Sequence, residues 1–149
     1  MGLKVHGDGL LVKRLQRTGE TTSREALNAV RHGADNIAKL AVRMAPVDEG
    51  NLEDAIRVEE EGDRDSSNRK VIRVGVDESM PIPGRPGKSV GDYATRIHEG
   101  SYKLGKKSRE KQSSDPSVAV GRKYLQRAAE KLEPQIKKAV ADALRQHIR

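Results

Sequence analysis

The feature that most constrains this sequence is an apolar stripe at helical spacing through residues 27–44. Its members recur every three or four positions and are Leu27, Val30, Ala34, Ile37, Ala41 and Met44. This spacing places them on one face of a helix. Thr22 and Glu25 have the spacing of a capping box at its start, and Pro46 ends it. Because the stripe spans fewer than about three heptads, it predicts a core-facing helix rather than a coiled coil.

A second helical pattern begins near Val118 and continues toward the C-terminus. Its apolar residues again share one face, and they are Leu125, Ala128, Leu132, Ile136, Ala139, Val140, Ala143 and Leu144. Pro134 lies inside this pattern, and we expect it to kink the helix or to start a new one.

Between the two helices, alternating residues predict a small antiparallel sheet. Ile72, Val74 and Val76 fall on one face of a strand over 71–76, which we expect to pair with 54–58. The acidic residues 59–65 are expected to form a solvated hairpin loop. The fold class is therefore α+β, with a long N-terminal helix and a long C-terminal helix packed on a small antiparallel sheet, plus extended loops or arms.

The length of 149 residues predicts a single domain over 1–149. Two segments, 79–91 and 101–117, are expected to be flexible loops, because the first is rich in proline and glycine and the second in lysine and serine. A short helix over Tyr93–His98, capped by Asp92, should separate them. The chain has no Phe and no Trp, so its core is thin and aliphatic, and neighbouring copies would supplement its burial.

Charge is strongly segregated along the chain. Residues 47–68 carry nine acidic residues against two basic ones, whereas residues 101–149 carry thirteen basic against five acidic. This pattern suits nucleic-acid binding or head-to-tail contact between copies, and equally an ordinary solvated surface. The acidic candidates for subunit contact are Glu59, Glu60 and Glu61. The basic candidates for facing DNA or a neighbouring ring are Lys103, Lys106, Lys107, Arg109 and Lys111.

The sequence offers little for catalysis. It has no cysteine, and its four histidines are scattered without metal-ligand spacing, so we expect no metal and no cofactor. Gly87-Lys88-Ser89 ends like a phosphate-binding loop, but Ile82 stands where the first glycine is required. His98 and Glu99 form a candidate general-base pair without an anchored nucleophile. We therefore expect no enzymatic activity, and the short apolar runs predict no membrane segment.

Four strings occur in a fixed order: AVRMAPVDEGNLEDAI at 41–56, VIRVGVD at 71–77, YATRIHEGS at 93–101 and RKYLQRAAEKL at 122–132. Together they resemble the tail-completion or neck proteins of long-tailed bacteriophages over about residues 10–145. The matching positions are Ala45, Pro46, Val47, Asp48, Gly50, Leu52, Tyr93, Ala94, Glu99, Gly100, Tyr124, Leu125 and Ala128.

The resemblance implies a structural virion protein that forms a ring at the head–tail junction around the DNA channel. Its partners would be copies of itself in a hexamer or dodecamer, a portal-side adaptor, tail terminator or tail tube proteins, and phage DNA. Its place would be the virion neck, after assembly in the host cytoplasm. Pro46 and Gly50 would shape a turn, Asp48 would cap the next segment, and Tyr93 with Glu99 would fix a helix. The alternative is a non-specific nucleic-acid-binding protein.

Overall fold

The computed structural model describes residues 4–6, 22–62 and 70–146. Its elements in chain order are β1 (Lys4–His6), α1 (Thr22–Met44), α2 (Asn51–Asp54), β2 (Ile56–Gly62), β3 (Lys70–Val76), α3 (Gly91–Glu99), α4 (Lys106–Ser114) and α5 (Tyr124–Arg145). The predicted α+β class and both long helices are confirmed. The remainder of the N-terminal stretch lies outside the described residues.

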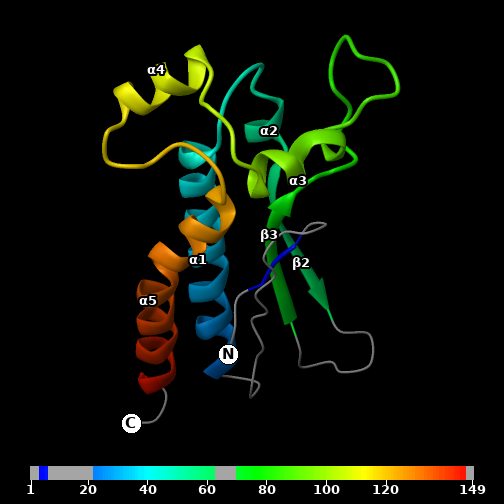
Figure 1. The fold of residues 1–149 in the computed structure, drawn as a ribbon. Helices are drawn as coiled ribbons and strands as arrows, with labels where there is room; N and C mark the ends of the chain where they lie inside the picture. Colours follow the sequence, from blue (N-terminus) through cyan, green and yellow to red (C-terminus); the bar gives the residue numbers. More distant parts are fainter. Residues whose placement is uncertain (1–3, 7–21, 63–69, 147–149) are drawn as a thin grey trace.

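Helix α1 is the centre of the molecule, with α5 along one side and β2 and β3 on the other (Figure 1). The predicted stripe is its buried face, where Ala34, Ile37 and Ala41 are 0% exposed. Gly33 marks a close approach of α1 to α5, because a Cβ there would lie 2.5 Å from Cγ1 of Ile136. The absence of a side chain at Gly33 lets the two helix axes come together.

The sheet has three strands in the order β1-β3-β2. Strand β2 pairs antiparallel with β3, with Val58 opposite Val74, which confirms the predicted hairpin pairing. Strand β1 adds a parallel neighbour to β3 that the sequence did not predict. Strand β2 extends to Gly62, so Glu59, Glu60 and Glu61 lie in a strand and not in the expected loop. A cross-strand partner for each of these residues on β3 keeps this part of β2 extended.

Helix α5 differs from its prediction at its start and at its proline. It begins at Tyr124 and not near Val118, because Lys123 adopts a left-handed conformation with φ 53°. It continues through Pro134, so the expectation of a separate helix is wrong. Pro134 is exposed, and the peptide group without an N–H therefore faces solvent and not the core. None of the described helices is both long enough and apolar enough to cross a membrane.

The segment before α3 has no long element, as predicted, and contains one isolated bridge between Pro81 and Ser89. The predicted short helix is α3, but Asp92 is not its cap. The Asp92 carboxylate instead accepts a hydrogen bond from the backbone N–H of Ser89 at 2.8 Å. The second predicted loop, 101–117, contains α4 and is therefore not a loop throughout.

Candidate functional site

The turn that follows α1, over residues 45–52, carries the first group of motif positions and is named the motif turn. Ala45 is fully buried and Leu52 is 5% exposed, so both belong to the core. Gly50 has φ +86°, a left-handed conformation that glycine adopts without strain, which supports its expected role in the turn. Gly50 itself occupies the cap position of α2 and no side chain caps the helix, so the capping role expected for Asp48 is wrong.

The motif segments of α3 and α5 meet beside this turn. The His98 and Tyr124 rings are both fully buried and lie edge to face, with centroids 5.0 Å apart. The backbone N–H of Lys123 donates to the carbonyl of His98 at 2.7 Å. Leu125 and Ala128 are buried behind Tyr124 in the core. The structure thus brings three sequence-distant motif segments to one end of α1.

The conformation of the end of α3 requires the motif glycine. A Cβ on Gly100 would lie 2.4 Å from the carbonyl oxygen of Arg96, closer than any side chain tolerates. Glu99 lies just before this point, and its carboxylate is 2.8 Å from Nδ1 of His98. Glu99 therefore orients the ring of His98 at the end of α3.

The His98–Glu99 pair has the geometry of a base and its orienting carboxylate, but its surroundings are a core. Burial lowers the pKa of His98, and its hydrogen bond to the Glu99 carboxylate opposes this only in part. Nε2 of His98 and the hydroxyl of Tyr124 find no hydrogen-bond partner within the described residues. A buried neutral imidazole against a tyrosine ring stabilises the junction of α3 and α5. No group of three or more His, Asp or Glu side chains in the described segments could hold a metal ion.

Hydrogen bonds and an ion pair hold helix α4 against the C-terminal end of α1. Nζ of Lys111 donates to the carbonyls of Val42 and Ala45 at 2.6 and 2.7 Å and forms an ion pair with Glu53. The carbonyls in the last turn of a helix lack helical partners, and an ammonium group satisfies them and opposes the helix dipole. The side chain of Lys111 is only 20% exposed. Lys111 therefore does not face DNA or a neighbouring ring as expected.

Ser108 and Lys107 complete the attachment of α4 to the motif turn. The Ser108 hydroxyl accepts from the N–H of Val47 at 2.9 Å and donates to its carbonyl at 3.0 Å. Ser108 is 3% exposed. Nζ of Lys107 donates to the Asp48 carbonyl at 2.6 Å. Of the predicted basic set, Lys103, Lys106 and Arg109 remain exposed without such backbone bonds, and Lys106 lies 3.9 Å from the Glu110 carboxylate.

Sequence reasoning missed Ser108 and the inward direction of Lys111. The signal available was their spacing, since residues three apart share one face of a helix. Helix α4 reads KKSREKQSS and contains no apolar residue, so no apolar stripe marks its buried face. Its contacts are with Val42–Asp48, about sixty positions earlier in the chain.

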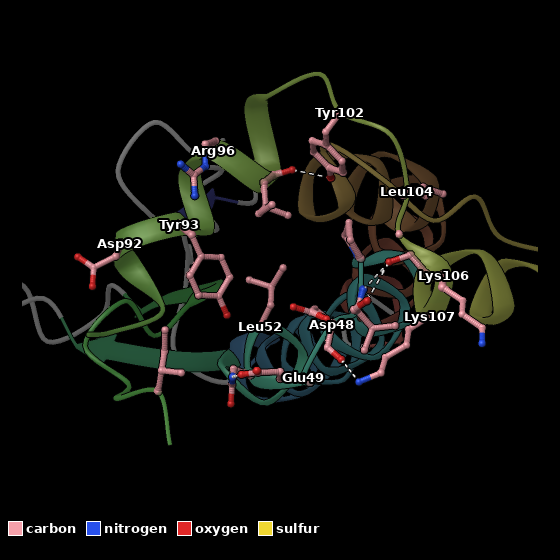
Figure 2. A pocket seen from close by; sticks show the side chains of 18 of the residues that line it. Asp48, Glu49, Leu52, Asp92, Tyr93, Arg96, Tyr102, Leu104, Lys106 and Lys107 are labelled. Atoms are coloured by element: carbon pink, nitrogen blue, oxygen red, sulfur yellow. Dashed lines mark hydrogen bonds between the residues drawn. The ribbon is translucent and has the colours of Figure 1, made fainter. Parts of the chain in front are cut away.

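A groove with a volume of about 900 Å³ lies between the motif turn, α3 and residues 102–108 (Figure 2). Tyr93 and Leu52 lie next to each other along one part of the hollow, and Leu104 lies across it (Figure 2). The Tyr102 hydroxyl donates to the Ile97 carbonyl at 2.7 Å and holds one end of the 102–108 segment. Burial, with the nearby Glu49 carboxylate, raises the pKa of Tyr93. The motif positions Pro46–Leu52 and Tyr93 thus line one continuous surface.

The predicted acidic contact residues differ among themselves. Glu60 forms a bidentate ion pair with Arg31 of α1, at 2.7 and 2.8 Å, and Arg31 lowers the pKa of Glu60. Glu61 pairs with Arg73 of β3 at 2.8 Å. Glu59 is exposed and forms no ion pair with any residue of the described ranges. Glu59 is therefore the acidic side chain of this set with its charge most available to another molecule.

Comparison with known proteins identifies the family. The family model described as "Bacteriophage HK97-gp10, putative tail-component" matches residues 11–95, more than half of the chain. The chain belongs to the HK97-gp10-like family. No curated protein and no solved structure gives a significant match. The matched range contains α1, the motif turn and Tyr93, so it supplies one wall of the groove, while α4 and α5 lie beyond it.

Membership of the HK97-gp10-like family confirms the resemblance to phage tail-assembly proteins that the sequence motifs carry. It makes the chain a tail-component-like structural protein of a bacteriophage, which is located in the virion.

Proposed function

We propose that this chain forms a ring at the head–tail junction of the virion, where it joins the portal side to the tail around the DNA channel. The observation that carries the proposal is the family match to a phage tail component over residues 11–95. The partners would be a portal-side adaptor on one side and a tail terminator or tail tube protein on the other.

The distribution of charge supports contact between copies. The acidic end of β2 and the basic segment around α4 lie at opposite ends of α1 (Figure 1). A contact between two different patches of the same protein repeats from copy to copy and closes a ring when the rotation allows it. Opposite charges on the two patches steer such an association. Hexameric or dodecameric rings would fit a tail and a portal, respectively.

Virions of the phage that encodes this chain provide the test. They would be decorated with an antibody to the chain, imaged, and analysed by mass spectrometry for its copy number relative to the portal protein. Label at the head–tail junction with six or twelve copies is the expected result. Label along the tail or at its tip, or absence from the virion, would contradict a neck ring.

A charge-swap experiment tests the contact itself. We expect Glu59→Lys or Lys103→Glu alone to block ring assembly, and the two changes together to restore it in part. Lys138→Glu is the matched control, because Lys138 is exposed on α5, away from both patches. Circular dichroism would verify that each variant is folded. Normal assembly of both single variants would contradict the charge contact.

The second candidate is non-specific nucleic-acid binding, which the exposed cations Lys103, Lys106 and Arg109 favour. It predicts that the isolated chain binds duplex DNA with an affinity that falls steeply with salt. A dissociation constant weaker than about 10⁻⁴ M at physiological salt would contradict this function, because typical non-specific binders are tighter.

A further inference from the structure

The groove beside the motif turn has the shape and chemistry of a docking site for a polypeptide. We propose that it binds a single segment of another virion protein, in which an aliphatic or aromatic side chain is flanked by carboxylates. This inference rests on the proposed function only in taking the partner to be another virion protein.

The inner surface of the groove is apolar. Tyr93, Ile97 and Leu104 are each only partly buried, and all three line the hollow with Leu52. Its volume of about 900 Å³ lies in the upper part of the range of specific binding pockets, about 300–1,000 Å³. Such a space accommodates more than one side chain of a partner, and its large apolar residues supply the type of surface that anchors binding.

The groove is formed before any partner arrives. The 102–108 segment is fixed at one end by the Tyr102–Ile97 hydrogen bond and at the other by the two bonds between Ser108 and Val47. Nζ of Lys107 donates a hydrogen bond to the carbonyl of Asp48, which links this segment to the motif turn at a further point. Since these walls need little ordering on binding, more of the contact energy appears as affinity.

The rim of the groove is predominantly basic. Six basic residues line it, against the three acidic residues Asp48, Glu49 and Asp92. One of the acids, Glu49, is paired with Arg85 at 3.4 Å. The excess positive charge favours carboxylates beside the anchoring side chain. DNA would satisfy the rim but has no apolar side chain to occupy the interior, so a protein segment matches both features.

The test uses the full chain and overlapping short peptides that cover every virion protein of the encoding phage, including this chain. Peptides that bind on an array would be labelled and titrated in solution by fluorescence polarisation. We expect bound peptides to carry an apolar residue among Asp or Glu. Leu104→Ser and Ile97→Ser should each weaken binding by about tenfold or more, as truncation at a binding hot spot does. Lys103→Glu should also weaken it and reduce its dependence on salt.

Matched controls lie on α5, where Lys138→Glu and Ala139→Ser change exposed positions outside the groove. Both should bind the same peptides as the unaltered chain, and urea denaturation would verify that the groove variants are folded. Several outcomes would overturn the inference: no bound peptide, bound peptides that are basic, or groove variants that bind as the controls do. A bound peptide from this chain itself would make the occupant a second copy, and displacement of peptide by duplex DNA would make it nucleic acid.

The two experiments test the docking inference and the proposed ring independently of each other. If virion imaging places the chain at the junction but no peptide binds, only the docking inference is wrong. If acidic peptides bind through the groove but the chain is absent from the junction, the ring is wrong and the docking surface remains.

Discussion

Two regions of helix α1 are held in different ways. Along most of its length α1 meets α5 through apolar contact, which includes the close approach of Gly33 to Ile136. At its C-terminal end it meets α4 through an ammonium group bound to backbone carbonyls, supported by the Ser108 hydroxyl. Apolar packing stabilises the fold in proportion to the area it buries. Hydrogen bonds to backbone carbonyls have a preferred direction, so they also determine where the donor side chain and its helix lie. The first arrangement builds the body of the molecule, and the second fixes the wall of the groove.

The largest expected effect comes from removing the ammonium group at the polar end. Lys111→Ala leaves the carbonyls of Val42 and Ala45 and the Glu53 carboxylate without this donor. We expect a loss of about 2–3 kcal/mol of unfolding free energy in urea, because partly buried polar groups would lose their partner. Amide hydrogen exchange should accelerate in α4 more than in the centre of α1. Lys106→Ala, at a side chain 84% exposed, is the control and should cost less than about 0.5 kcal/mol. Equal losses in the two variants would contradict a structural role for Lys111.

The apolar contact between α1 and α5 can be weakened by adding one methyl group. Gly33→Ala forces a Cβ against Ile136, and we expect a net loss of about 1–2 kcal/mol after the gain in helix propensity. The loss should be smaller when measured in an Ile136→Ala background, since the clash is then absent. Gly105→Ala is the control, because a Cβ at Gly105 meets nothing within 4 Å. Identical costs of Gly33→Ala in both backgrounds would contradict the close helix contact.

A pH titration examines His98, which lies where α3 packs against Tyr124 of α5. Burial holds the folded-state pKa of His98 below its ordinary value of about 6.5. Below that pH the unfolded chain takes up a proton that the folded chain excludes, so stability falls as pH falls. We expect the unfolding free energy to fall between pH 6.5 and 5.5, measured by urea denaturation at each pH. His98→Phe should remove this slope and His32→Gln, at an exposed position, should retain it. An unchanged slope in His98→Phe would assign the pH dependence to other groups.

The smallest effect should come from a polar contact at the surface. Arg31 and Glu60 form a bidentate pair, but their side chains are 43% and 32% exposed. Arg31→Ala should cost less than about 1 kcal/mol. Because Arg31 lowers the pKa of Glu60, this contribution is present above the unfolded value of about 4.3 and is lost as pH falls through the folded value. Urea denaturation at neutral and acidic pH measures it. A cost as large as that of Lys111→Ala would show that burial does not distinguish the two polar contacts.

The sequence predicted the elements whose stability comes from apolar burial. The stripe through Ile37 identified α1, and the alternation through Val74 identified β3 and its partner. Strand β1 has three residues, too few for an alternating pattern to distinguish it. Helix α4 could not be predicted in this way, because its position depends on polar bonds to the far end of α1. The motif residues that line one half of the groove could therefore be identified from the sequence. The wall over residues 102–108 could not be identified in this way.

Among the described strands β2 lies at an edge of the sheet, which has a consequence for newly made chains. An edge strand offers unpaired backbone groups that another strand can join, and proteins commonly prevent this with charge. Strand β2 lies at the edge of the sheet and carries Glu59, Glu60 and Glu61 in succession. Two chains that approached through this edge would bring like charges together, and sheet-to-sheet polymerisation is disfavoured. The three glutamates therefore protect newly synthesised chains against polymerisation through this edge.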